Sequence, residues 1–157
     1  MNELINLLKT NARLSNAELA VMLNKTENEI AEMIHKLEKD GIIKGYTTIF
    51  DDEIISKDSV GAYVELKVTP AAQVGYDDIA RHIASFQEVE SVWLMSGGYD
   101  LAVILRCDNI KDVCSYVAQR LATISGVVST STHFFLQKYK DNGISVTGEN
   151  PDERGVN

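Results

Sequence analysis

The stretch SNAELAVMLNKTENEIAEMIHKLEKDG, residues 15–41, decides how the first part of this chain folds. It holds two capping boxes, in which a Ser or Thr is followed three residues later by a Glu: Ser15 with Glu18, and Thr26 with Glu29. In such a box the hydroxyl accepts a hydrogen bond from a free amide of the first helical turn, and the carboxylate reaches back to the cap. The sequence therefore predicts two helices. So few residues separate them that we expect a steep crossing, as in a helix-turn-helix.

Flanking residues extend this unit in both directions. Residues 2–11 carry an apolar stripe at helical spacing, which predicts a helix before the pair. The third helix, residues 26–41, ends at Gly41, a residue typical of helix C-termini. Residues 42–50, IIKGYTTIF, are β-branched and aromatic and predict a wing or a short linking strand. A generic three-helix bundle is the alternative, because only the tight turn is specific.

The chain changes character after this unit. In chain order we expect a strand (59–70), a helix (74–86), two strands (89–95 and 101–107), a helix (109–124) and a strand (126–139). The order strand-helix-strand-strand-helix-strand is that of the ferredoxin-like split βαβ fold. The predicted fold class is therefore α+β, an N-terminal winged helix-turn-helix followed by a ferredoxin-like βαββαβ domain.

In this fold both helices cover one face of the sheet, so the other face needs a cover of its own. We expect that face to carry Tyr63, Trp93 or its neighbours, and Phe134 or Phe135. An apolar face of this size rarely stays in contact with water. A second copy that packs sheet to sheet would bury it, so an obligate dimer is predicted.

Charge also separates the two parts. The net charge is −8, which taken alone argues against binding nucleic acid. Residues 1–50 hold six Lys+Arg and seven Asp+Glu, whereas residues 51–157 hold nine and sixteen. The acidity therefore belongs to the second part. The polar end, residues 140–157, shows no periodicity and is expected to be a disordered acidic tail.

Other classes of protein find little support in the sequence. We find no membrane-spanning run and no signal peptide, and the two cysteines, Cys107 and Cys114, lack metal-ligand spacing. A reduced cytoplasmic location fits this pattern. Three histidines, His35, His82 and His133, fall in separate elements, and no catalytic set, phosphate loop or cofactor motif is present. An enzyme, or the regulatory subunit of one, remains an alternative for a ferredoxin-like domain, although the catalytic set is missing.

The first unit resembles the winged helix-turn-helix of the Lrp/AsnC (feast/famine) family of transcriptional regulators. The matching pieces are NAR, S--ELA--L, I---I--LE-DGII-GY and the closing Asp51, in register over some forty-five residues. The second unit resembles the ligand-binding module of the same family, often called regulation of amino-acid metabolism (RAM) and similar to ACT domains. Its matching pieces are V-SVW-MSGGYDLAV (89–103) and ISGVVSTSTHFFL (124–136).

The resemblance implies that the third helix reads double-stranded DNA. The candidate DNA-binding residues are Lys25, Thr26, Glu27, Asn28, Ala31, Glu32, His35, Lys36 and Lys39. Asn28 could pair with adenine, a glutamate could accept from cytosine, and the lysines could contact phosphates. Glu27 and Glu32, however, would be repelled by phosphates. The lysines could also form nothing more than a solvated helix face.

SGGYD, residues 96–100, joins two apolar strands and has two interpretations. It could be a tight hairpin turn in which Gly97 and Gly98 supply positive φ. It could also leave amides open to a carboxylate while Asp100 holds an ammonium group. The resemblance implies an amino-acid effector site here, between dimers, although Gly98 stands where the family usually has an acid. The candidate effector-binding residues are Ser96, Gly97, Gly98, Tyr99, Asp100, Thr130 and Thr132.

We therefore predict a cytoplasmic DNA-binding regulator that responds to an amino acid or a related metabolite. Its expected parts are a DNA-binding domain (1–51), a linker (52–59), an effector-binding and oligomerisation domain (60–139) and the tail (140–157). It would form dimers and assemble into tetramers or octamers, and it would need no cofactor or metal. The alternative is a modulator of the same fold with weak or no DNA binding, which acts by effector sensing or hetero-oligomerisation.

Overall fold

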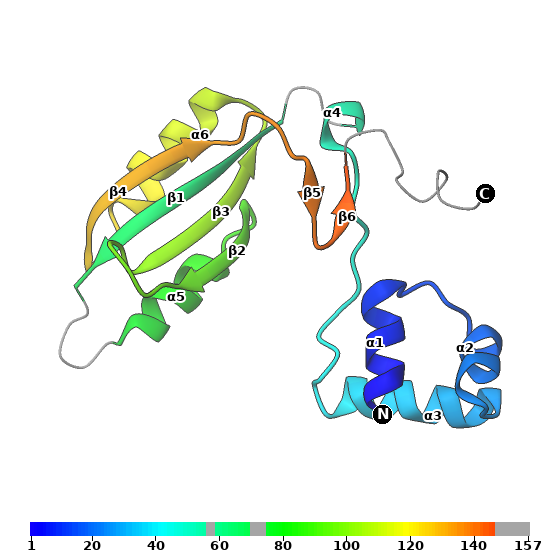
Figure 1. Cartoon of the computed structure of the whole chain (residues 1–157). Helices are drawn as coiled ribbons and strands as arrows, with labels where there is room; N and C mark the ends of the chain where they lie inside the picture. Colours follow the sequence, from blue (N-terminus) through cyan, green and yellow to red (C-terminus); the bar gives the residue numbers. More distant parts are fainter. Residues whose placement is uncertain (56–58, 70–74, 147–157) are drawn as a thin grey trace. The chain divides into compact units, whose positions relative to one another are not determined.

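The computed structural model describes residues 1–55, 59–69 and 75–146, and it divides into two units between Thr48 and Ile49 (Figure 1). The first unit is helical and the second is built on an antiparallel sheet. In the part of the chain that is described, no helix is both long and apolar enough to cross a membrane.

Three helices make the first unit: α1 (Asn2–Thr10), α2 (Asn16–Leu23) and α3 (Glu27–Lys39). Both predicted capping boxes are formed. The amide of Glu18 donates to Ser15 Oγ at 3.2 Å and the amide of Ser15 donates to Glu18 Oε2 at 2.7 Å. In the second box the amide of Glu29 donates to Thr26 Oγ1 at 3.3 Å and the amide of Thr26 donates to Glu29 Oε2 at 2.8 Å. The buried core consists of Leu4, Leu19, Ala20, Ile30 and Leu37.

The turn between α2 and α3 is as tight as the sequence predicts. Asn24 ends α2 in the left-handed conformation, with φ of 51°. The next amide, of Lys25, donates to Ala20 O at 2.9 Å, and Thr26 already caps α3. Asparagine tolerates this conformation better than most residues because its short polar side chain can bond locally. The helix-turn-helix is confirmed.

The expected wing or strand over residues 42–50 is not formed. The amides of Ile42 and Ile43 still bond to Leu37 O, at 2.9 and 3.1 Å, and so complete the end of α3. Beyond them, no backbone hydrogen bond joins residues 44–50 to another described residue. A strand needs a neighbouring strand to accept and donate its ladder bonds. The composition of this segment favours a strand, but the described part of the chain offers it no partner.

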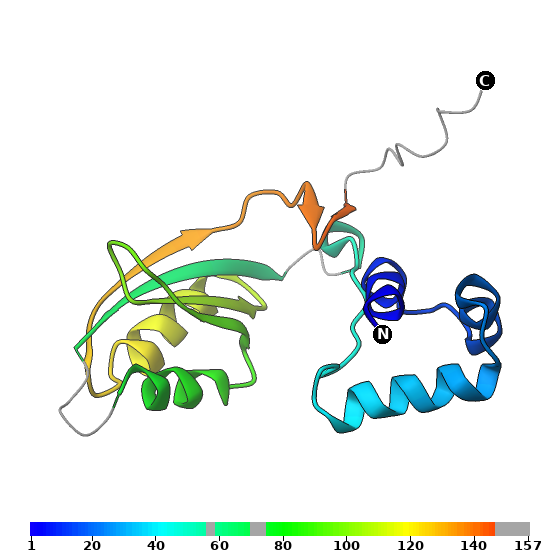
Figure 2. The ribbon, with the colours of Figure 1, turned by 60° about the horizontal axis from the view of Figure 1, so that its bottom comes forward.

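The second unit confirms the ferredoxin-like order. Its elements are β1 (Val60–Val68), α5 (Tyr76–Ala84), β2 (Val89–Leu94), β3 (Leu101–Cys107), α6 (Ile110–Tyr116), the π-helical turn η1 (Val117–Leu121) and β4 (Val127–Phe134). The sheet order is β2-β3-β1-β4, and every pair is antiparallel. Figure 2 shows α5 and α6 on one face of this sheet. The unexpected feature is that the second long helix changes from α to π geometry before it ends.

Alternation along β1 fixes which face is which. Ala62, Val64, Leu66 and Val68 are all buried, as the sequence predicts. They pack with Ile79 and Ile83 of α5 and with the inward side chains of β3 and α6. Burying one such side chain fully is worth about 1.5–3 kcal/mol relative to leaving it exposed.

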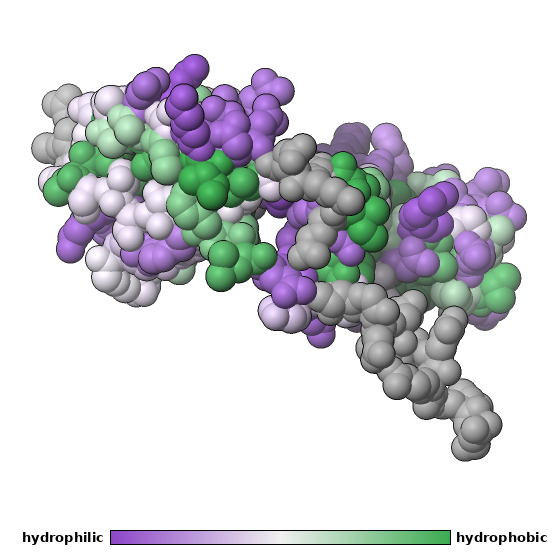
Figure 3. Space-filling model, turned by 90° about the horizontal axis from the view of Figure 1, so that it is seen from above, coloured by the Kyte–Doolittle hydropathy of each residue, from purple (hydrophilic) through white to green (hydrophobic). Residues whose placement is uncertain are grey.

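The opposite face of the sheet lacks a covering layer in the described chain. It carries Tyr63, Ile104 beside it in the ladder, and Trp93, whose side chain is 60% exposed. Phe135 lies against Gly61 on β1, whereas Phe134 pairs with Ala62 and packs into the core, so Phe135 belongs to this face and Phe134 does not. We call this surface the open face. On the side of the molecule seen in Figure 3, hydrophobic patches are interleaved with hydrophilic residues.

Secondary structure is also formed in the predicted linker and in the predicted tail. The predicted linker begins with a short helix, α4 (Asp52–Ile55). The predicted tail begins with a two-stranded hairpin, β5 (Lys140–Asp141) and β6 (Ile144–Ser145), so the expectation of disorder is corrected for residues 140–146. The linker residues 56–58 and the tail residues 147–157 lie outside the described residues.

A cluster of charges ties these pieces to the sheet. Asp52 Oδ2 accepts from Arg106 Nη2 at 3.0 Å and from Lys138 Nζ at 2.9 Å. Arg106 also bonds Glu90 on β2 at 2.7 Å, and Lys138 bonds Asp141 on β5 at 3.1 Å. We call these five residues the Asp52 clasp. The hydrogen bond from Lys138, followed by the positive charge of Arg106, holds the pKa of Asp52 below its usual range in spite of partial burial.

Replacing Asp52 tests the clasp. Since the pKa of Asp52 is lowered in the folded state, its stabilisation is complete above the unfolded pKa of about 3.9 and is lost as the pH falls through the folded value. Asp52→Asn should lower the free energy of unfolding by about 1 kcal/mol at neutral pH, a modest amount because the pairs are partly exposed. This difference should shrink as the pH falls below the unfolded pKa.

Denaturant titrations followed by the fluorescence of Trp93, the chain's one tryptophan, measure this free energy for the second unit. Asp108→Asn is the matched control, because Asp108 is exposed and no hydrogen bond or ion pair joins it to another described residue. A loss in Asp52→Asn that stays the same at every pH would contradict an ionic role for the clasp.

Candidate functional site

The exposed side of α3 is the first candidate surface. All nine predicted DNA-binding residues, from Lys25 to Lys39, are exposed, whereas Ile30 and Leu37 hold the opposite side of the helix in the core. Met33 and Ile34 are half-buried at the boundary. The helix therefore presents one continuous polar side, which is the geometry that a helix needs to enter a DNA groove.

Several groups on this surface are already engaged. The Thr26 hydroxyl caps the helix, so its role here is structural. Lys36 Nζ lies 2.8 Å from Asp40 Oδ2, and Lys25 Nζ lies 3.7 Å from Glu29 Oε1. These exposed pairs are weak and open easily for a phosphate. Lys39 forms no ion pair within the described chain, so it is the readiest phosphate contact of the three.

Asp100 has a structural role that the sequence did not suggest. Its Oδ2 accepts from the amide of Val68 at 2.7 Å, at the end of β1. Its own amide donates to Leu66 O at 2.9 Å, and its carbonyl accepts from Met95 at 2.8 Å. Asp100 therefore closes the turn between β2 and β3 and fastens it to the central strand.

The expected role of the two glycines is corrected. Gly97 and Gly98 do not have positive φ, and an added Cβ at either would meet nothing within 4 Å. The turn can therefore be made without them, because Asp100 supplies the closing bonds. What the glycines provide is bare backbone that is open to solvent at the tip of the turn.

Tyr99 connects the turn to the open face. Its hydroxyl is hydrogen-bonded to that of Tyr63, and the two rings meet edge to face with centroids 6.3 Å apart. This hydrogen bond raises the pKa of Tyr63 to about 12. The ring of Tyr63 also lies near that of His133, with centroids 6.1 Å apart. The Nε2 atom of His133 is 3.4 Å from Glu65 Oε1.

Sequence reasoning missed this cluster of Tyr63, Glu65, Tyr99 and His133, although one signal was present. Residues 63 and 65 alternate with the buried positions of β1, and His133 stands at the same alternation in the last strand. Only the register, which pairs Tyr63 with His133, brings the two strands together at this point.

The structure does not bring Thr130 and Thr132 to Tyr99. Thr130 pairs with Leu66 and Thr132 with Val64, both of which point into the core. Directly opposed residues in a sheet share a face, so the two threonines lie on the helix-covered side. Ser96, Gly97, Gly98 and Asp100 stay together with Tyr99 in the turn, and the expected grouping of seven is thus divided.

Metal binding finds no support within the described residues. They contain no group of three or more His, Cys, Asp or Glu side chains placed to hold an ion. Cys107 and Cys114 are free thiols, and burial raises the pKa of Cys107.

Comparisons with known proteins agree with both units. Residues 2–44 match the family described as winged helix-turn-helix DNA-binding, and residues 61–144 match the family described as Lrp/AsnC ligand binding domain. The chain is 42% identical over 156 residues to the uncharacterized HTH-type transcriptional regulator YugG of Bacillus subtilis strain 168, a match that covers 98% of this chain and 93% of the relative.

Solved structures show the same fold. The crystal structure of PH0061 is similar with a TM-score of 0.76 at 29% identity, covering 88% of this chain and 92% of that one. The complex of the transcriptional regulator NMB0573 with L-Met, from Neisseria meningitidis, is similar with a TM-score of 0.72 at 20% identity, covering 92% and 93%.

Substitutions in the turn at 96–100 separate the fastening role of Asp100 from the role of the two glycines. Asp100→Ala leaves the amide of Val68 without its acceptor and should lower the free energy of unfolding of the second unit by about 1–3 kcal/mol. Asp100→Asn keeps an oxygen acceptor and should cost less. Gly98→Ala, the control, should be neutral or slightly stabilising because its φ is not positive and its surroundings are open. Trp93 fluorescence in denaturant measures all three, and equal stability of Asp100→Ala and wild type would refute the fastening role.

Proposed function

We propose, on the premise that the chain belongs to the Lrp/AsnC family of DNA-binding transcriptional regulators, that it binds DNA through α3 and assembles through the open face. The chain is such a regulator and not an enzyme. The observation that carries the proposal is the pairing of an exposed, capped α3 with a ferredoxin-like unit in which the described residues cover only one face of the sheet. We place its action in the cytoplasm.

In this proposal the first turn of α3 reads bases and its last turns hold phosphates. Recognition helices contact base edges through their N-terminal residues, and Glu27 and Asn28 stand there. Asn28 would pair with adenine, and Glu27 would accept from cytosine. Lys36 and Lys39 lie in the last turn, where a cation also complements the helix dipole.

The second candidate is a modulator of the same fold with weak DNA binding. The observation that favours it is the charge of the exposed side of α3, where Glu27 and Glu32 stand among the lysines and two of the lysines are paired to acids within the unit. Its action would then depend on effector sensing or on hetero-oligomers. Both candidates require the same assembly, so DNA affinity distinguishes them.

Three variants test DNA reading, measured by titration of a fluorescent duplex selected from a random library at two salt concentrations. Lys39→Gln should weaken binding to every sequence and lower the salt slope by about one, because one phosphate contact is lost. Glu32→Gln should tighten binding to every sequence, because a repelling charge is removed. Asn28→Ala should remove about 1–3 kcal/mol of discrimination between bases at one base pair of the preferred sequence.

Lys111→Gln supplies the control, since it makes the same charge change on α6 of the second unit. If wild type fails to select any sequence and binds duplexes no better than Lys39→Gln does, the modulator is the correct candidate. If all three variants bind as wild type does, α3 is not the reading element.

Dimerisation through the open face is supported by two features of the described chain. Trp93, Tyr63, Ile104 and Phe135 form an apolar surface that no element of the described chain covers. In addition, residues 44–50 favour a strand and have no pairing partner in the described chain. A second copy would satisfy both needs, and higher assembly into tetramers or octamers would follow from further contacts of such dimers.

Trp93→Asp tests this assembly. It places a charge in the proposed interface and should shift the particle from dimer or larger toward a monomer of the 17.4 kDa chain. Ile110→Asp is the control, because Ile110 is similarly exposed but begins α6 on the other side of the sheet. Sedimentation velocity at micromolar protein measures the mass, and a monomeric wild type would refute the proposal.

For the effector we propose an amino acid or a related metabolite bound at the turn formed by residues 96–100. The exposed backbone of Gly97 and Gly98 is suited to a carboxylate. Asp100 accepts from Val68 through Oδ2, and in this proposal its Oδ1 accepts from the ammonium group. The Neisseria regulator, solved with L-Met, supports this ligand class. Because Tyr99 bonds Tyr63, a ligand at the turn would also act on the open face.

A further inference from the structure

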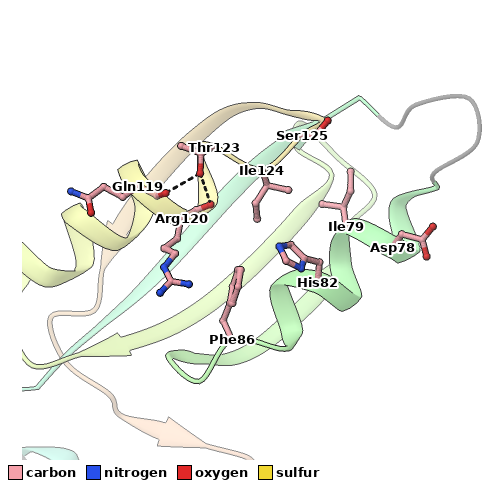
Figure 4. A pocket seen from close by; sticks show the side chains of 9 residues that line it. All are labelled: Asp78, Ile79, His82, Phe86, Gln119, Arg120, Thr123, Ile124 and Ser125. Atoms are coloured by element: carbon pink, nitrogen blue, oxygen red, sulfur yellow. Dashed lines mark hydrogen bonds between the residues drawn. The ribbon is translucent and has the colours of Figure 1, made fainter.

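A groove lies in the helical layer of the second unit, between α5 and the π-helical turn η1. Its volume is about 560 Å³, within the range typical of small-molecule sites. Ile79, Phe86 and Ile124 form an apolar floor, and Arg120 and His82 lie on either side of Phe86 (Figure 4). No residue of the turn at 96–100 lines it, so it is separate from the proposed effector site.

Arg120 is the charged group of this groove that has no acidic partner among the described residues. Its guanidinium carbon lies 5.7 Å from the centroid of the Phe86 ring, and its N–H groups donate to no other described residue. The other two arginines of the second unit's described residues pair with acids, Arg81 with Asp77 and Asp78, and Arg106 with Asp52 and Glu90. Within the described chain no acid pairs with Arg120, although the second part of the sequence is acidic overall.

The π-helical turn explains where Arg120 stands. The amide of Ala122 bonds to Val117 O at 2.8 Å, a bond across five residues. Val117 and Leu121 remain buried on either side of the widened turn. Such turns occur frequently at functional sites. Here the turn keeps the helix anchored in the core while Arg120 comes to lie over Phe86.

The charged and polar side chains that line this groove favour an anion near Phe86. The His82 ring stacks edge to face on Phe86, with centroids 4.9 Å apart, so it adds a second group able to donate a hydrogen bond. The one acid of the lining, Asp78, is 3.9 Å from Arg81, and in Figure 4 its carboxylate points away from Arg120. The groove thus combines an apolar floor with a cation that lacks an acidic partner.

We propose that this groove binds a small organic carboxylate with a compact apolar body, as a ligand site separate from the turn at 96–100. The carboxylate accepts two hydrogen bonds from Arg120, whose planar fork matches its two oxygens. The apolar body lies against Ile79, Phe86 and Ile124. The site requires neither DNA binding nor dimerisation, so it can be tested independently of both.

Calorimetry with three probes tests the site: 3-methylbutanoate, 4-methyl-2-oxopentanoate and phenylpyruvate, with 3-methylbutan-1-ol as the uncharged counterpart. At least one carboxylate should bind at millimolar concentration and the alcohol more weakly. Arg120→Gln should weaken the carboxylate about ten- to a hundredfold, the value of a charge-assisted hydrogen bond. Lys111→Gln, which makes the same charge change on α6 outside the groove, should bind as wild type does.

A second measurement locates the bound probe and does not depend on the stability of any variant. In protein with ¹³C-labelled isoleucine methyl groups, the probe should shift the signals of Ile79 and Ile124, which Ile→Val substitutions assign. The proposal is overturned if none of the carboxylates binds, if Arg120→Gln binds as tightly as wild type, or if Asp100→Ala abolishes binding while the signals of Ile79 and Ile124 stay in place.

Discussion

Strand β1 is the constraint on which the second unit depends. It is hydrogen-bonded along both edges, to β3 and to β4, so neither its register nor its orientation can change without breaking two ladders. A slip of one residue would exchange the buried and outward sets of its side chains. Both α5 and α6 pack on the set that begins at Ala62, and the set that begins at Tyr63 forms the open face. One alternating sequence thus decides the core and the exposed apolar surface together.

The loops of this unit are attached to the same strand. Asp100 fastens the turn between β2 and β3 to the far end of β1, and Tyr99 reaches over its outward side to Tyr63. At the other end Phe135 covers Gly61, where an added Cβ would approach the ring to 2.7 Å. The turn, where we propose that an effector binds, and the open face are therefore neighbours through a single strand. This is a direct route by which ligand binding and assembly can be coupled.

Local chemistry in the sequence predicted much of the fold. The capping boxes at Ser15 and Thr26 gave two helix starts, and the alternation of β1 gave the buried face, because both signals depend on residues close in the chain. The failures share another cause. The strand expected over 42–50 needs a partner from elsewhere, and Thr130 and Thr132 were assigned without the register that turns them inward. The Asp52 clasp joins residues as far apart as 52 and 138, which no local pattern reveals.

The candidate sites were predicted less well than the fold for the same reason. The exposed side of α3 follows from helical spacing alone, so its residues could be named in advance. In the turn at 96–100, composition suggested that the glycines set the conformation. Asp100 does so instead, because its side chain accepts from the amide of Val68 and its backbone carbonyl accepts from the amide of Met95. The groove beside Arg120 had no signal in the sequence, because a π-helical turn leaves no mark in the spacing of apolar residues that a reader could distinguish from an ordinary helix.

That turn has an evolutionary consequence. A π-helical turn contains one residue more than the α-helical turn that could replace it, and each residue of an α-helix rotates the chain by about 100°. Loss of a single codon between Val117 and Leu121 would therefore restore a regular helix and swing Arg120 away from Phe86. Relatives could gain or lose a charged partner for Phe86 in one genetic step, while the sheet and the DNA-binding unit remained as they are.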